Sequence, residues 1–190
     1  MVDQIKTRMT ASEYLQMPET NQRTELLDGL LTIYGEDDVS PAPVNDHQRL
    51  VRRSSRVVEN IIPNGEVFTA PTDVHFDELN VVQPDIFWVA ENSRCVEVDG
   101  KYWYGAPDLI TEVLSPGTEY KDRGKKFRLY QKYGVREYWL ISRIESFVEV
   151  YNLADEVFIQ QGVYGAEDSF ISPALAEKPV DVKLIFSSSN

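Results

Sequence analysis

The sequence contains one cysteine, Cys95, and two histidines among 190 residues. A single cysteine excludes an intrachain disulfide and any zinc cluster built from several cysteines. No apolar run approaches the ~18–20 residues that a bilayer-spanning helix needs. The first residues, MVDQIKTRMTASEY, lack the apolar core of a signal peptide. We therefore expect a cytoplasmic protein with a reduced thiol and no membrane association.

Hydrophobic residues make up 42% of the chain and charged residues 26%, and no long low-complexity tract is present. This composition suits one folded domain over residues 1–190. Within it we expect an N-terminal helix and hairpin over 11–34, a core over about 46–151, and C-terminal strands over 152–186. No linker or internal repeat divides the chain.

The net charge of −12 argues against a general attraction to nucleic acid, because a negative field repels phosphates. The basic residues are nevertheless concentrated in two islands, which hold 11 of the 19 Lys and Arg residues. These islands are Arg49, Arg52, Arg53 and Arg56, and Lys121, Arg123, Lys125, Lys126, Arg128, Lys132 and Arg136. Two interpretations stay open, a phosphate-binding surface and ordinary solvated faces.

Capping and turn signals locate the N-terminal elements. Thr10 and Glu13 have capping-box spacing for a helix from about residue 11. The segment TELLDGLLTIY reads as a β-hairpin, with Asp28-Gly29 as its turn. Asp46 can cap a helix that runs to about residue 62 and places its arginines opposite its apolar face.

The rest of the chain alternates strands with one further helix. That helix is expected over about 121–133, ended by Gly134. The expected strands are EVFTAPTDVHF, VVQPDIFWV, DLITEVLSP, EYWLIS, a pair joined at LADE, and VDVKLIF, with a polar insertion at about 91–107. This order predicts an α/β fold with a mixed sheet.

Two carboxylates interrupt apolar strands. Strand alternation places Glu112 on the same face as Ile110 and Leu114, and Asp85 on an apolar face of VVQPDIFWV. A carboxylate among aliphatic side chains is costly to desolvate unless a partner compensates it. If the two strands pair, the carboxylates can converge closely enough to favour a divalent cation.

The helix at 121–133 adds a cation to this arrangement. One stripe of the helix consists of Asp122, Lys126, Leu129, Tyr130 and Tyr133. The aliphatic and aromatic members make this the packed face, so Lys126 should point toward the sheet that carries Asp85 and Glu112. The sequence thus predicts two carboxylates and one ammonium in one place.

A purely structural interpretation accounts for the same residues. Glu112 and Lys126 can form a semi-buried ion pair, and Asp85 can lie at a strand end and face water. His47, on the apolar side of its helix, can be a hydrogen-bonded helix-start residue or a ligand. Spacing alone leaves the structural and metal-site interpretations open.

The segments ELLDGLL, NDHQRL, VVQPDIFWV and GAPDLITEVLSPGTEYKDRGKKFRLYQKYGVREYWLIS resemble the Uma2 (DUF820) family of the PD-(D/E)XK, or restriction endonuclease-like, superfamily. The similarity runs over about residues 12–151 and is most specific over 105–141. It implies a restriction endonuclease-like core, with a four-stranded mixed sheet flanked by helices and additional hairpins. It also implies an endonuclease that depends on Mg²⁺ or Mn²⁺ and acts on nucleic acid, with DNA as the expected substrate.

Carried over by position, Asp85 matches the aspartate of the PD motif and Glu112 the acidic residue of the (D/E)XK motif. Leu114 stands where that motif has lysine, and Lys126 matches the lysine of a later family pattern, as a migrated replacement. Ser142 stands where the family usually has Asp. The accessory candidates are His47, Asp122 and Tyr130.

The resulting hypothesis is phosphodiester hydrolysis in which Asp85, Glu112 and Lys126 are catalytic, and Asp85 and Glu112 also bind the metal. The candidates for nucleic-acid contact are Arg49, Arg52, Arg53, Arg56, Lys121, Arg123 and Lys125. A homodimer is expected, because cutting both strands of DNA calls for two sites. The alternatives are a binding or regulatory module that keeps the nuclease fold without useful catalysis, and a structural homo-oligomer.

Overall fold

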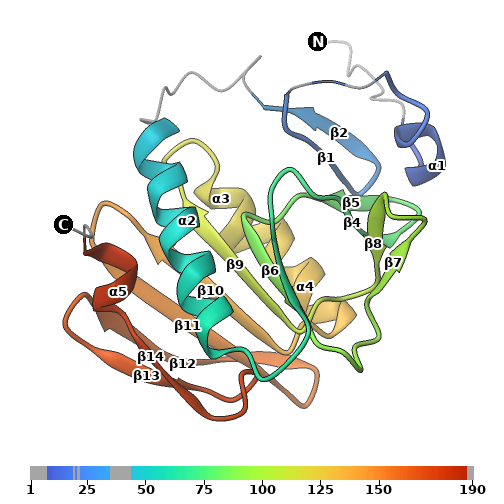
Figure 1. Ribbon diagram of the computed structural model, residues 1–190. Coiled ribbons are helices and arrows are strands. Elements are labelled where there is room, and N and C mark those ends of the chain that lie inside the picture. The colour runs from blue at the N-terminus through green and yellow to red at the C-terminus, as the bar shows by residue number, and fades with distance from the viewer. Residues whose placement is uncertain (1–7, 19, 21, 35–43, 188–190) are drawn as a thin grey trace.

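The computed structural model describes residues 8–18, 20, 22–34 and 44–187. Its centre is a six-stranded mixed sheet with the order β12-β11-β10-β9-β6-β3 (Figure 1). These strands are β3 (Glu66–Thr69), β6 (Ile86–Val89), β9 (Leu109–Leu114), β10 (Glu137–Ser142), β11 (Phe147–Ala154) and β12 (Val157–Gly165). Only β9 and β10 run parallel, and the other neighbours are antiparallel. The sheet therefore has six strands rather than the expected four.

A second six-stranded sheet packs beside the first, with the order β2-β1-β5-β4-β8-β7. Its strands are β1 (Thr24–Leu27), β2 (Leu30–Ile33), β4 (Val74–Asp77), β5 (Asn80–Val82), β7 (Val96–Val98) and β8 (Tyr102–Tyr104). A separate hairpin joins β13 (Ser169–Ser172) to β14 (Lys178–Asp181).

Helices lie on both faces of the central sheet (Figure 1). They are α2 (Val44–Ile61), α3 (Glu119–Lys121), the π-helical turn η1 (Asp122–Lys126), α4 (Phe127–Tyr133) and α5 (Lys183–Phe186). The short helix α1 (Ala11–Tyr14) packs instead against β1 and β5 of the second sheet. One apolar cluster joins α2 and α5 to the sheet through residues such as Val58 and Trp139. A second cluster joins α4 and the second sheet to the opposite face, through residues such as Phe87 and Tyr130, and a third packs Ala11 and Tyr14 against the second sheet. None of the helices in the described ranges is long and apolar enough to cross a bilayer.

Three of the local cap and turn signals are confirmed. The Thr10–Glu13 capping box is present. Asp28 and Gly29 join β1 to β2 with φ of 54° and 75°, the positive values that a tight hairpin turn requires. Gly134 ends α4 with φ of 86°. Alternation on β9 is also confirmed, because Ile110 and Leu114 both pack in the cluster on the α4 side.

Two expected strands are wrong, and each breaks at a proline. EVFTAPTDVHF splits into β3 and β4, which belong to different sheets, and VVQPDIFWV splits into β5 and β6. Pro71 and Pro84 lie in the two breaks and have no N–H for a sheet ladder. Asp85 therefore lies immediately before β6 and not inside a strand.

Three further boundaries differ from the expectation. The polar insertion contains β7 and β8, since the hairpin they form adds to the second sheet. VDVKLIF ends its strand at Asp181 and continues as α5. Asp46 is not the cap of α2 but lies in its first turn, where a carboxylate favours the helix dipole.

Candidate functional site

Asp85 and Glu112 meet where β6 begins beside β9. Ile86 pairs with Thr111 in the antiparallel ladder, which sets Asp85 next to Glu112. The backbone N–H of Asp85 donates to Glu112 Oε2 at 3.3 Å, and the N–H of Val113 donates to Asp85 Oδ2 at 2.8 Å. Both side chains are buried. The two carboxylates predicted to converge therefore lie together.

Lys126 reaches the same place from the helix that covers this face. Its Nζ lies 3.0 Å from Glu112 Oε1, 2.8 Å from Glu25 Oε1 and 3.4 Å from Asp122 Oδ1. The residue is 1% exposed. The π-turn η1, which runs from Asp122 to Lys126, presents both of these side chains to the sheet, and such turns are frequent at functional sites.

The accessory candidates are also part of the cluster. His47, in α2, places Nε2 3.2 Å from Asp85 Oδ2 and 3.2 Å from the Val113 carbonyl oxygen. Tyr130, in α4, donates its hydroxyl hydrogen to Glu112 Oε1 at 2.8 Å. Residues as far apart in the chain as His47 and Tyr130 thus contribute to one polar cluster.

Two residues of the cluster were missed by the sequence analysis. Arg23 donates Nη1 to Asp85 Oδ1 at 2.8 Å and places Nη2 3.2 Å from Glu25 Oε1 and 3.7 Å from Glu112 Oε2. Glu25 is fully buried in β1 and pairs with Lys126. Glu25 is an acid inside the apolar run TELL, and this is the same signal by which the sequence singles out Glu112. Arg23 carried no comparable signal.

The arrangement of charges sets the protonation of each group. Burial would raise the pKa of Asp85, but Arg23 and His47 hold that pKa well below its ordinary value. Burial raises the pKa of Glu112, and the nearby negative charge of Asp85 raises it further. The attraction of Lys126 lowers this pKa but does not outweigh the other effects. The two pKa values differ because Arg23 and His47 both contact Asp85 at hydrogen-bond distance, whereas Glu112 also lies close to the negative charges of Asp85 and Glu25. Glu112 is the more readily protonated of the pair.

Burial and neighbouring charges also set the pKa values of the groups that the helices contribute to the site. Burial would lower the pKa of Lys126, but Glu112, Glu25 and Asp122 keep it well above its ordinary value, so the side chain is an ammonium. Burial raises the pKa of Asp122 to about 8, since the attraction of Lys126 compensates only in part. Burial would also lower the pKa of His47, but its hydrogen bond with Asp85 raises that pKa overall.

A pocket of about 110 Å³ opens among these side chains. Its lining residues are Arg23, Tyr34, His47, Asp85, Glu112, Val113, Ser115, Thr118, Asp122 and Lys126. The volume admits several water molecules or a hydrated ion, since one water needs roughly 10–15 Å³ by this kind of measure. It does not admit a nucleotide, so a phosphate group would have to approach from the mouth.

The pocket contains carboxylate and carbonyl oxygens, which are the ligand atoms that a hard divalent cation prefers. Within the described residues no group of three or more His, Cys, Asp and Glu side chains is arranged to hold a metal, and Arg23 and Lys126 form ion pairs with the carboxylates of the pocket. Asp85 Oδ2 and the Val113 carbonyl nevertheless both lie 3.2 Å from His47 Nε2. Adjacent ligands of an octahedral Mg²⁺ are about 3 Å apart at its usual bond lengths.

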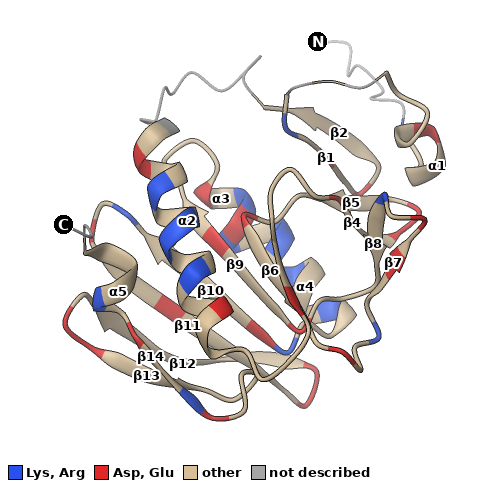
Figure 2. Cartoon of the chain, viewed as in Figure 1, with Lys and Arg blue, Asp and Glu red and all other residues tan. Residues whose placement is uncertain are grey.

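Basic residues recur along α2 (Figure 2), and Arg49, Arg52 and Arg53 among them line a groove. The groove, about 500 Å³, is lined by Asp46, Arg49, Leu50, Arg52, Arg53, Arg143, Ser146 and Phe186. Arg53 donates to the backbone oxygen of Phe186 at 3.2 Å. Arg56 is exposed on the same helix but does not line the groove. Arg143 was not foreseen, because it comes from the loop after β10.

The basic residues of the second island do not line this groove. Lys121 is buried, with Nζ 4.4 Å from the centre of the Tyr34 ring. Arg123 forms ion pairs with Glu119 and Glu149 at 2.6 Å each. Lys125 is exposed and lies 3.2 Å from Asp28.

Comparisons with known proteins agree with this architecture. Residues 11–181 match the Uma2 family, described as "Putative restriction endonuclease". Protein slr1290 of Synechocystis sp. is 28% identical over 156 residues, which cover 78% of this chain and 76% of that protein. A crystal structure from Anabaena variabilis, described as a putative nuclease of DUF820, superposes with a TM-score of 0.73 at 21% identity and covers 94% of this chain and 97% of that one.

Proposed function

Because the chain belongs to the Uma2 family, we propose that it is a metal-dependent endonuclease that hydrolyses phosphodiester bonds in DNA. One observation carries the proposal. The carboxylates of Asp85 and Glu112, the carbonyl of Val113 and the ammonium of Lys126 all line one small pocket. Two carboxylates and a carbonyl are a ligand set that Mg²⁺ accepts, since this ion keeps several waters and completes its shell with substrate phosphate.

In this proposal Asp85, Glu112 and the Val113 carbonyl hold the ion, and His47 lies beside them as a further donor. A divalent ion bound there would supply Lewis acidity toward water and the scissile phosphate. The ligands are held in advance by the protein. Val113 N–H fixes Asp85 Oδ2 at 2.8 Å, and Tyr130 fixes Glu112 Oε1 at 2.8 Å.

Lys126 provides the positive charge that the reaction needs. Its ammonium stays protonated because the acidic side chains of Glu112, Glu25 and Asp122 surround it. A charge held in place in a site with little water stabilises the negative charge that develops on a phosphate during hydrolysis. The groove lined by Arg49, Arg52 and Arg143 can contact phosphates that flank the cleaved bond.

A plasmid-nicking assay with Mg²⁺ or Mn²⁺ tests the proposal. The variants Asp85→Asn, Glu112→Gln and Lys126→Met should each lower the rate at least ~100-fold. The control Glu97→Gln removes an exposed carboxylate of β7 and should leave the rate unchanged. Equal nicking by the wild type and the three site variants would refute the assignment.

A second function, nucleic-acid binding without hydrolysis, is favoured by Arg23. Its guanidinium lies between Asp85 and Glu112 and already neutralises charge that a metal would neutralise. Calorimetry with Mn²⁺ separates the two functions. Mn²⁺ binding that disappears in Asp85→Asn supports the enzyme, and no Mn²⁺ binding by the wild type supports the binding module.

We also propose that the protein acts as a homodimer, since one copy carries one such pocket. The strand β12 is the last in the central sheet, with Ile159 and Val163 about half exposed. An apolar edge strand is a surface on which a second copy can pair. Sedimentation velocity should give a dimer for the wild type and a monomer for Ile159→Lys, and a monomeric wild type would contradict the proposal.

A further inference from the structure

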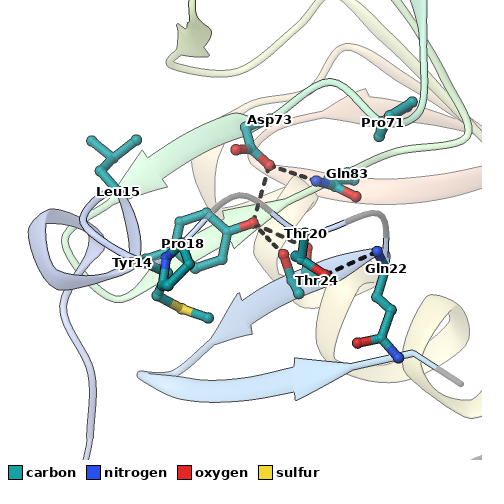
Figure 3. A pocket seen from close by; sticks show the side chains of 10 residues that line it. Tyr14, Leu15, Pro18, Thr20, Gln22, Thr24, Pro71, Asp73 and Gln83 are labelled. Carbon is teal, nitrogen blue, oxygen red and sulfur yellow. Dashed lines mark hydrogen bonds between the residues drawn. The ribbon is translucent and has the colours of Figure 1, made fainter. Parts of the chain in front are cut away.

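A second cavity, of about 380 Å³, lies beside the catalytic pocket (Figure 3). Gln22 and Thr24, the chain neighbours of Arg23, line this cavity, whereas Arg23 itself lines the catalytic pocket. Among the residues that the structure describes, the two pockets share no lining residue. The volume lies within the ~300–1,000 Å³ typical of small-molecule sites, so the cavity is large enough for a small organic molecule.

Asp73 gives this cavity its charge. In the described part of the chain it is the only Asp, Glu, Lys, Arg or His side chain among the lining residues. Its Oδ1 accepts a hydrogen bond from Gln83 Nε2 at 2.9 Å and lies 3.2 Å from the Tyr14 hydroxyl oxygen. Its Oδ2 has no hydrogen-bond partner among the described residues and, unlike Gln83 Oε1, is not fully buried (Figure 3). The cavity thus offers a ligand one accessible carboxylate oxygen.

No cation within the described chain compensates this carboxylate. Asp73 forms no ion pair with a described Lys, Arg or His side chain. Burial raises the pKa of Asp73, and its hydrogen bonds with Gln83 and Tyr14 oppose that rise only in part. The negative charge of Glu25 raises this pKa further. A half-buried carboxylate without a cationic partner is costly to keep charged, and a bound cation would remove much of that cost.

The remaining walls favour an organic cation over a metal ion. Mg²⁺ and Ca²⁺ prefer a shell of several oxygen ligands with more than one carboxylate or phosphate group, and this cavity supplies one carboxylate. Apolar surface comes from the ring of Tyr14 and from Leu15, Pro18 and Pro71. An ammonium group on an apolar body matches both parts of the wall, because its N–H groups can donate to the carboxylate while the body lies against the apolar side chains.

The carboxylate is held in place in advance of any ligand. The backbone oxygen of Asp73 accepts a hydrogen bond from the N–H of Trp103 at 2.9 Å. Gln83, which holds Asp73 Oδ1, is itself fixed, since its N–H donates to Glu25 Oε1 at 3.2 Å and its carbonyl accepts from Arg23 Nη2. A site ordered before binding loses less conformational freedom when the ligand arrives.

We propose that this cavity binds a small organic cation, an ammonium group carried on an apolar body, which donates a hydrogen bond to Asp73 Oδ2. The inference does not depend on the proposed nuclease function. A neutral alcohol of similar shape would leave the charge of Asp73 uncompensated, and a carboxylate ligand would be repelled by it. Charge-assisted hydrogen bonds are stronger than neutral ones, so the preference for the ammonium should be about tenfold or more.

Three probes of similar shape and different charge test the proposal: 2-phenylethylammonium, 2-phenylethanol and phenylacetate. NMR titration of the ¹⁵N-labelled wild type at neutral pH gives the dissociation constant of each probe. The ammonium should bind with a Kd of about 10 mM or tighter, as expected for a molecule of this size. Its affinity should exceed that of the alcohol at least ~10-fold, and phenylacetate should bind more weakly than either. The amide signals that shift should include those of Leu15 and Asp73.

Three results with the wild type would overturn the proposal. They are the absence of ammonium binding, equal affinity for the ammonium and the alcohol, and signal shifts confined to residues outside the cavity.

Variants identify the residues responsible. Asp73→Asn should reduce the preference for the ammonium over the alcohol to below about threefold. The control Asp155→Asn removes an exposed carboxylate between β11 and β12 and should retain the full preference. Leu15→Ala, at a side chain that is 47% exposed, should weaken the ammonium and the alcohol by the same factor, because it removes apolar surface and no charge.

Urea unfolding checks that each variant is folded. A folded Asp73→Asn that keeps the wild-type preference would overturn the proposal. Should that variant not fold, the affinities and signal shifts of the wild type decide the question alone.

Discussion

The ammonium of Lys126 lies 3.0 Å from Glu112 Oε1, although the two residues belong to a helix and to a central strand. Leu114, which stands at the position of the motif lysine, packs instead in the apolar cluster beneath that helix. The helix therefore supplies the cation that the strand lacks. An ion pair between a helix and a strand thus takes the place of one between positions 112 and 114 of the same strand.

Replacing Lys126 by methionine should lower both the unfolding free energy and the rate of metal-dependent cleavage. Removal of the ammonium leaves Glu112, Glu25 and Asp122 buried without their shared cation, which costs about 3–5 kcal/mol of unfolding free energy. Metal-dependent cleavage should fall at least ~100-fold. Urea denaturation and the nicking assay measure these changes, and Lys178→Met, at an exposed site, is the control. A variant with wild-type stability would contradict the description of the buried cluster.

Replacing Arg23 by methionine should strengthen metal binding. The guanidinium, 2.8 Å from Asp85 Oδ1, opposes a second cation at the same carboxylate. We expect Mn²⁺ affinity to rise about tenfold, which corresponds to ~1.4 kcal/mol. Calorimetry measures the Mn²⁺ affinity, with Arg49→Met as the control. Weaker Mn²⁺ binding would mean that Arg23 holds the carboxylates in place for the ion.

Asp122 should make the protein less stable as the pH rises. Burial raises its pKa to about 8 from an ordinary value of 3.8, so between these values the folded state binds more protons than the unfolded state. Unfolding free energy should therefore fall as the pH rises from about 4 to about 8. Asp122→Asn should remove this part of the slope in urea titrations at several pH values. An unchanged slope would contradict the assignment.

His75 should have the opposite effect at lower pH. Burial lowers its pKa from 6.5 to about 4, and its ring stacks on Tyr102 with centres 4.0 Å apart. The unfolded state then binds more protons, so stability should be lost as the pH falls from about 6.5 to about 4. His75→Gln should flatten the curve in this window. An NMR titration giving His75 an ordinary pKa would contradict it.

The groove should govern the salt dependence of DNA binding. Each phosphate contact contributes about −0.9 to the slope of log K against log salt concentration. The double variant Arg52→Gln and Arg143→Gln should therefore reduce the slope by about 2. Glu97→Gln serves as a control, and anisotropy at several salt concentrations with a labelled duplex provides the measurement. An unchanged slope would place the DNA elsewhere.

Much of the site followed from the sequence because it depends on local periodicity. Strand alternation gave the face of Glu112, and helical periodicity gave the face of Lys126, since both patterns reflect fixed backbone geometry. The Thr10–Glu13 capping box and the Asp28-Gly29 turn were predictable for the same reason. The breaks in the two expected strands were not predictable. A proline interrupts a sheet ladder only where its missing N–H would have been paired, and the sequence alone does not show where that is.

The sequence by itself therefore determined which charged residues interrupt an apolar pattern: Asp85, Glu112 and Lys126. Only the tertiary structure decided their partners. Glu25 lies in β1 of the second sheet and Arg23 immediately precedes that strand. The separation of 60 or more residues between these two side chains and Asp85 and Glu112 leaves no periodic pattern in the sequence. Desolvation explains why they matter, since buried carboxylates require cations at hydrogen-bond distance, and only the packing of distant elements brings those cations there.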